Sequence, residues 1–162
     1  MASKTVEPGA VLPRSAWLSV LQETVAEVLS IMAGLTVEFR CAAPAETAQL
    51  TAIVGIAGAI RANLIIRCSQ GASITLVSQM LGISPDSPHS QKAANDALGE
   101  ICNVVAGYFK AKVGLGEACG LSVPTIIVGR DYKFHSAGRY EQLEFPVSFQ
   151  GETLHLTLEI AQ

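Results

Sequence analysis

The feature that most constrains the fold of this chain is the order of its helical and strand-like segments. Apolar residues recur with helical spacing in residues 15–33, 72–81 and 91–113. Apolar and alternating segments predict strands at residues 35–41, 50–56, 60–68, 121–128, 140–149 and 153–160. Strands that follow one another through short links usually pair antiparallel. We therefore expect an α+β fold, in which two helix-plus-three-strand units form an antiparallel-rich sheet covered by helices.

Capping and turn residues support these boundaries. Ser15 is a suitable N-cap for the first helix, and Gly34 is a suitable stop. Gln150-Gly151 is typical of a hairpin turn. A chain of 162 residues is long enough for one domain with its own core. We expect a flexible N-terminal tail at residues 1–14 and a single domain at residues 15–162.

The composition excludes several classes of protein. Hydrophobic residues make up 49% of the chain and charged residues only 15%, against about 25% charged residues in an average soluble protein. This balance excludes disorder and indicates a lightly polar surface that a partner covers. Eleven basic and fourteen acidic residues give a net charge of −3. A negative chain is not expected to bind nucleic acid by neutralising its phosphates.

The sequence predicts neither an export signal nor a membrane span. Residues 1–13 lack the apolar segment of a signal peptide. The longest uncharged stretch, residues 68–85, is interrupted by Ser, Gln, Gly and Thr, and so does not match the roughly 20 apolar residues that a span needs. We expect a cytoplasmic protein without membrane insertion.

Cysteine and histidine residues do not form a recognisable metal-binding or redox motif. No two cysteines have CxxC spacing, and the three histidines are scattered along the chain. The cysteines are therefore expected to be reduced, buried, small apolar residues: Cys41, Cys68, Cys102 and Cys119. No metal site and no bound cofactor are predicted.

The helix at residues 91–113 has one apolar and one polar face. At about 100° per residue, the apolar residues fall on one side, which we expect to be buried: Ala94, Leu98, Ile101, Val105 and Tyr108. A polar stripe falls on the opposite side: Asp96, Glu100, Asn103, Gly107 and Lys110. The stripe is expected to face solvent or a partner.

Glu100 and Asn103 are neighbours on this stripe, because residues three apart lie on one helix face. A carboxylate can pair with a positive group of a partner, and a carboxamide can position a water. Neither side chain is an obvious nucleophile, so such a site would act on something that a partner supplies. The spacing alone also fits two solvated helix residues.

Small residues beside the pair favour close contact with another protein. Glycine inside a helix costs about 1 kcal/mol against alanine, and both Gly99 and Gly107 fall within this one. We interpret them as bare surface for a partner, with Asp96 and Lys110 as further candidate contacts. Asp96 could equally serve only to stabilise the start of the helix.

Three segments resemble one protein family. Residues 96–110 (DALGEICNVVAGYFK) resemble the Glu-x-x-Asn signature of the CheC/CheX/FliY chemotaxis phosphatases. Residues 120–129 (GLSVPTIIVG) are similar to the family's strand after that helix, and residues 54–66 resemble its central hairpin. The order of elements also fits, so the resemblance covers roughly residues 15–160.

The resemblance implies a phosphatase that acts on phosphorylated CheY or a related response regulator. In that family the Asn orients a water for in-line attack on the aspartyl phosphate, which would be the role of Asn103. The Glu pairs with a lysine of the receiver domain, which would be the role of Glu100. The receiver would supply the phosphorylated Asp and the Mg²⁺, so the chain itself would need no cofactor.

The number of signatures indicates which branch of the family the chain resembles. CheC-type members carry a second Glu-x-x-Asn in the first helix, whereas here Glu23 precedes Ala26 and Glu27 precedes Ser30. A single site resembles the CheX arrangement, which implies a homodimer. Two other functions remain open: a non-catalytic dimeric binding module for receiver domains or other signalling proteins, and a structural piece of a flagellar switch.

Overall fold

The computed structural model describes residues 10–40, 48–130, 132 and 135–162. Within them the chain forms three α-helices and six strands. The helices are α1 (Trp17–Ala33), α2 (Gln70–Leu81) and α3 (Pro88–Lys112). The strands are β1 (Leu50–Gly58), β2 (Arg61–Cys68), β3 (Cys119–Leu121), β4 (Thr125–Val128), β5 (Tyr140–Phe149) and β6 (Glu152–Ala161). Short 3₁₀ turns precede α1 (Arg14–Ala16) and β3 (Gly116–Ala118).

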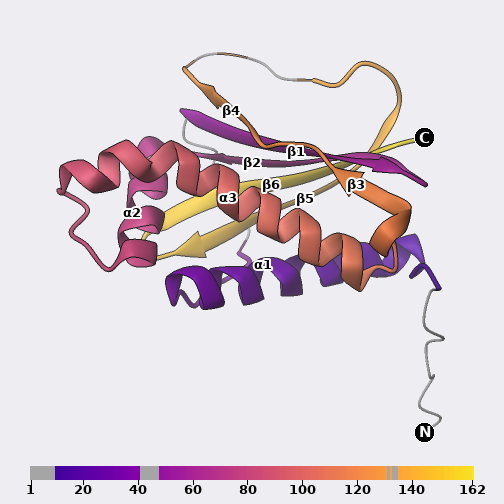
Figure 1. Cartoon of the computed structure of the whole chain (residues 1–162), viewed down its shortest axis with the longest axis horizontal. Coiled ribbons are helices and arrows are strands. Elements are labelled where there is room, and N and C mark those ends of the chain that lie inside the picture. Colours follow the sequence, from indigo (N-terminus) through magenta and orange to yellow (C-terminus); the bar gives the residue numbers. More distant parts are fainter. Residues whose placement is uncertain (1–9, 41–47, 131, 133–134) are drawn as a thin grey trace, which may run out of the picture.

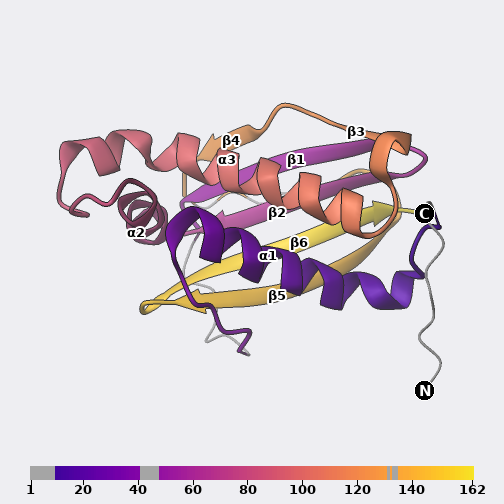
Figure 2. The same cartoon turned by 60° about the horizontal axis from the view of Figure 1, so that its bottom comes forward.

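The strands form one antiparallel sheet in the order β3-β1-β2-β6-β5, with β4 also paired to β1. Figure 1 shows β3 and β4 end to end along the same edge of the sheet. The helices α1 and α3 lie across one face, and α2 packs beside α3 at one end (Figure 2). The expected α+β fold, an antiparallel sheet covered by helices, is confirmed.

The core lies between this sheet and the helices. Alternate strand residues such as Leu64 and Leu158, which are register partners on β2 and β6, are fully buried there. On the helix side, the Trp17 ring of α1 meets the Phe109 ring of α3 edge to face, with centroids 5.5 Å apart. Aromatic pairs in this geometry stabilise a core beyond the area that they bury.

The first predicted strand, residues 35–41, is wrong. Its described part makes one isolated bridge, in which Glu38 and Ser148 exchange backbone hydrogen bonds of 3.0 and 2.8 Å. The next outward-facing donor along β5 would be Pro146, which has no N–H. The ladder therefore stops after one bridge. Residue 41 of the prediction lies outside the described residues.

Two further boundaries differ from the prediction. The expected strand 121–128 divides into β3 and β4, because Pro124 stands between them. The third helix begins at Pro88 rather than at residue 91, because the Ser87 side chain caps it by accepting from the His89 N–H and proline suits a first helical position. The predicted ends at Gly34 and Gln150-Gly151 are confirmed by their positive φ angles.

Two described residues between β4 and β5 are hydrogen-bonded to the sheet. The Tyr132 hydroxyl hydrogen-bonds the Thr51 hydroxyl of β1, and the Ser136 hydroxyl donates to the Glu159 carboxylate of β6. Gln142 Nε2 also donates to Glu159, over 3.1 Å. The bonds from Ser136 and Gln142 give hydrogen-bond partners to the Glu159 carboxylate, which is buried.

One helical stretch among the described residues, Arg14–Ala33, is long and apolar enough to cross a membrane by length and composition alone. The sequence analysis predicts no membrane-spanning segment. In this structure Trp17, Leu21 and Leu29 of the stretch are buried in the core. Packing against the sheet and α3 therefore accounts for its hydropathy.

A half-buried histidine on β6, His155, makes the stability of the fold depend on pH. Burial lowers the pKa of His155 and the neighbouring Arg67 guanidinium lowers it further, while Glu144 raises it. The unfolded chain, with its ordinary pKa of about 6.5, therefore binds this proton more readily than the folded chain. Stability falls as the pH drops through that value. We expect the free energy of unfolding of His155→Gln to fall less than that of the native chain when the pH is lowered from about 7 to about 5. Urea unfolding at each pH measures this difference.

His89→Gln is the matched control, since His89 is exposed at the start of α3. This control is expected to keep the native pH dependence of unfolding. Identical pH dependence in His155→Gln and the native chain would contradict the assigned role of His155.

Candidate active site

The polar stripe lies on the outer side of α3, above the sheet edge. The buried side of this helix carries Leu98, Cys102, Val105 and Phe109. Opposite them, Asp96 and Glu100 are exposed and Asn103 is half-buried. The expected placement of the carboxylate and the carboxamide on one accessible face of a helix agrees with the structure.

Tyr108 was expected in the buried face, and this is wrong: 43% of it is exposed. The ring of Phe109 takes the core position instead, because Trp17 of α1 packs on it. The apolar face of α3 is therefore rotated toward Cys102 and Phe109. The sequence offered two adjacent aromatic residues and nothing that told which one α1 would cover.

Cys102 lies between Glu100 and Asn103 in the sequence but points into the core. Its Sγ is 3.6 Å from the Leu64 carbonyl and 3.8 Å from the Ala52 carbonyl. Burial raises the pKa of this thiol to about 12, so it stays protonated and is no nucleophile. The prediction of a packing cysteine is confirmed for Cys68, Cys102 and Cys119, all buried and free. Cys41 lies outside the described residues.

Gly99, Asn103 and Gly107 form one row along α3, because they are spaced four residues apart. A Cβ on Gly99 would lie 3.1 Å from Ile126 Cδ1 and 3.4 Å from Pro124 Cβ. A Cβ on Gly107 would lie 3.7 Å from Leu121 Cδ1. Gly99 therefore faces Pro124, between β3 and β4, and Ile126 of β4, whereas Gly107 faces Leu121 of β3. The expectation that Gly99 offers bare surface to a partner is corrected, because Pro124 and Ile126 cover it.

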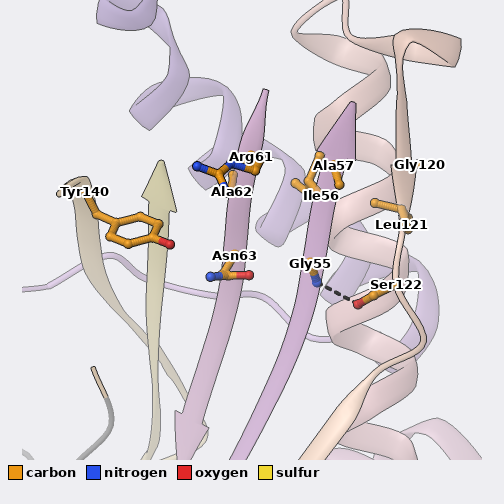
Figure 3. Close-up of a pocket in the computed structure, with 10 residues that line it drawn as sticks. All are labelled: Gly55, Ile56, Ala57, Arg61, Ala62, Asn63, Gly120, Leu121, Ser122 and Tyr140. Atoms are coloured by element: carbon orange, nitrogen blue, oxygen red, sulfur yellow. Dashed lines mark hydrogen bonds between the residues drawn. The ribbon is translucent and has the colours of Figure 1, made fainter. Parts of the chain in front are cut away.

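The segment between β3 and β4, Ser122-Val123-Pro124, is here called the edge link. Its backbone is tied to β1: the Ser122 N–H donates to the Gly55 carbonyl over 2.9 Å, and the Gly55 N–H donates to Ser122 Oγ over 2.8 Å (Figure 3). Ser122 Oγ also donates to the Val123 carbonyl. Asn103 stands midway between the two glycine contacts, so it lies beside the edge link.

A shallow hollow lies on the other side of this link, over β1 and β2. It has a volume of about 470 Å³, and Asn63, Ser122 and Tyr140 are among the residues that line it. In Figure 3 the Tyr140 ring reaches over the sheet toward Asn63. The hollow therefore faces away from Asn103 and does not extend the Glu100–Asn103 pair.

The lysine at the end of the stripe is engaged within the chain. Lys110 Nζ donates to the Gly116 carbonyl in the turn after α3, and its neighbour Lys112 pairs with Glu27 of α1. The remaining stripe is acidic, through Asp96 and Glu100. Among the described residues, no group of three or more His, Cys, Asp or Glu side chains could hold a metal ion.

The chemistry of this site is that of positioning. Asn103 can donate one hydrogen bond and accept another, and Glu100 can attract a cation. Within the stripe Asp96, Glu100, Asn103, Gly107 and Lys110, no side chain is a thiol or a hydroxyl nucleophile. The arrangement can hold a water molecule and a charged partner in place, and the reacting group must come from that partner.

Several solved structures share the fold of this chain. The fold matches CheX from Vibrio vulnificus with a TM-score of 0.74 and 21% identity, covering 92% of this chain and 99% of that one. It matches the CheX–CheY–BeF₃–Mg²⁺ complex from Borrelia burgdorferi with a TM-score of 0.76 and 20% identity, covering 90% and 98%. FliY from Thermotoga maritima matches with a TM-score of 0.63 and 15% identity, covering 93% and 92%. The chain thus has the fold shared by CheX and FliY.

Sequence comparison narrows this class to one family. The family model for the chemotaxis phosphatase CheX matches residues 50–148. The CheY-P phosphatase CheX of Thermotoga maritima is 32% identical over 115 residues, which cover 68% of this chain and 72% of that protein. The chain belongs to the CheX family of chemotaxis phosphatases.

Proposed function

We propose that this chain is a phosphatase that accelerates hydrolysis of the aspartyl phosphate on a CheY-like response regulator. The observation that carries the proposal is the half-buried Asn103 carboxamide on the polar stripe of α3, with Glu100 exposed one turn before it. Membership of the CheX family supports it, as does the relative named a CheY-P phosphatase. The Borrelia burgdorferi relative has been solved with CheY, BeF₃ and Mg²⁺.

In the proposed reaction Asn103 orients the attacking water. The water oxygen bonds to phosphorus while the bond from phosphorus to the Asp oxygen breaks, and the electron pair stays on the leaving carboxylate. Inorganic phosphate leaves with the protons of the water. Fixing a water in line with the breaking bond removes much of the entropic cost of the attack. The receiver supplies the phosphorylated Asp and Mg²⁺, so this chain needs no cofactor of its own.

Glu100 serves in docking rather than in bond breaking, through a lysine of the receiver. We expect Glu100→Lys to raise the KM for the phosphorylated receiver about tenfold or more, because it replaces attraction by repulsion. The kcat at saturation should change much less. Steady-state phosphate release at increasing receiver concentration measures both constants.

Glu141→Lys is the control for this change, because Glu141 is an exposed acid on β5, at the opposite edge of the sheet. It carries the same change in net charge and should leave KM unaltered. A Glu100→Lys variant with the native KM would remove Glu100 from the docking surface.

The rest of the stripe completes the proposed contact surface. Asp96 adds a second exposed acid, and Gly107 lies half-buried one turn after Asn103. Lys110 stands at the far end, where its amine already binds the Gly116 carbonyl. We also propose that the chain is a cytoplasmic homodimer, as its resemblance to CheX implies and its low share of charged residues supports.

A further inference from the structure

Val123 in the edge link is an apolar side chain without cover. It is 83% exposed, the highest value among the large exposed hydrophobic residues of the described chain. A single exposed valine is ordinary on a protein surface. The exposure of Val123 is informative because this residue lies close to the candidate site.

The row on α3 fixes its position relative to the candidate site. Gly107 faces Leu121 on one side of the edge link, and Gly99 faces Pro124 on the other. Since α3 and the link run alongside each other (Figure 1), the residue of the row between the two glycines, Asn103, lies beside Ser122 and Val123. The valine therefore borders the carboxamide that would enter the active site of the receiver.

The link holds Val123 in a fixed place. Ser122, the residue before it, exchanges two hydrogen bonds with Gly55 of β1, one of which is drawn in Figure 3. The Ser122 hydroxyl also donates to the Val123 carbonyl. Pro124, the residue after it, has its φ angle restricted by its ring and lies against α3 at Gly99. A contact residue that is already ordered loses little conformational entropy when a partner binds.

A polar pair alone gives little affinity. A hydrogen bond between neutral groups contributes about tenfold or less to an equilibrium after the loss of water is counted, and an exposed ion pair contributes less. A few residues near the centre of an interface supply most of its affinity, and the removal of apolar surface from water is the dominant favourable contribution to most protein–protein association. On this ground, and resting on the proposed function, we propose that Val123 is a docking contact for the receiver domain, packing on an apolar surface beside the phosphorylated Asp.

The test compares Val123→Asn with Val128→Asn. Val128 is also a strongly exposed valine, at 65%, on the same edge of the sheet in β4, and five residues of extended chain place it about 16 Å away. Neither change alters the charge. Val123→Asn should raise both the KM for the phosphorylated receiver and the Kd for the receiver loaded with BeF₃ and Mg²⁺ by about tenfold. Its kcat should stay within about twofold of the native value, and Val128→Asn should change neither constant.

The outcomes separate this inference from the proposed function. The comparison uses a receiver on which the native chain is active and Asn103→Ala is not, so the proposed function has passed its own test first. An unchanged KM and Kd in Val123→Asn would overturn the inference. So would an equal rise in Val128→Asn, or a fall in kcat alone. Val123→Leu, which keeps the apolar surface, should keep native binding.

Discussion

Replacing Asn103 by alanine is expected to lower the kcat for receiver dephosphorylation by about a hundredfold or more. Loss of a single group that positions or stabilises the reacting atoms commonly costs this much. In the proposed reaction no other side chain of the stripe can both donate to and accept from the water, because the stripe otherwise holds two carboxylates, a glycine and a lysine that binds the Gly116 carbonyl. Single-turnover decay of a phosphorylated receiver, with the chain in excess, measures the effect free of docking.

Asn95→Ala is the matched control. Asn95 is a half-buried asparagine on the same helix, two turns before Asn103. It should keep most of the activity, and both variants should melt within a few degrees of the native chain, because neither side chain fills the core. Native kcat in Asn103→Ala would contradict the assigned role of the carboxamide.

Replacing Gly99 by leucine has the second largest expected effect. A Cβ alone would stand 3.1 Å from Ile126 Cδ1, so a full side chain must push β4 and the edge link away from α3. Overpacking of this kind costs about 1–3 kcal/mol, which exceeds the gain of about 1 kcal/mol from a better helix former. We expect a free energy of unfolding lower by up to about 2 kcal/mol and dephosphorylation slowed about tenfold or more by the displaced Asn103.

Gly107→Leu is the matched comparison, because here the same substitution is expected not to lower the stability. A Cβ there makes only an ordinary contact, 3.7 Å from Leu121 Cδ1, and the position is half-buried. This variant should unfold at a urea concentration equal to or above that of the native chain, because the helix gains propensity without a clash. A Gly99→Leu variant as stable as Gly107→Leu would contradict the contact between α3 and the edge link.

The pattern of residues predicted the helices and most of the strands, because apolar periodicity reports burial directly. The two strand predictions that differ from the structure each depend on one proline, which interrupts the pairing of strands. Residues 35–40 alternate like a strand, but Pro146 on the neighbouring strand leaves no donor after the first bridge. Pro124 divides an apolar run that periodicity alone joins. Such effects depend on which strands become neighbours, and a single segment does not contain that information.

The candidate site was predicted in outline for a related reason. That Glu100 and Asn103 share one face of α3 follows from helix geometry alone, and both are accessible on that face in the structure. Gly99 and Tyr108 were misplaced, because their surroundings come from the edge link and from α1. The exposure of Val123 is not predicted by the sequence, since a valine within an apolar segment is expected to be buried in the core. The proline after it was the one local sign that the strand breaks there.

The most direct measurement follows the loss of phosphate from a panel of phosphorylated receiver domains of the same organism, with and without this chain. We expect at least one receiver to lose its phosphate faster in the presence of the native chain, and to return to its intrinsic rate with Asn103→Ala. Receivers that bind the chain but keep their intrinsic rate would contradict a phosphatase, and would favour a non-catalytic binding module that uses the same face of α3.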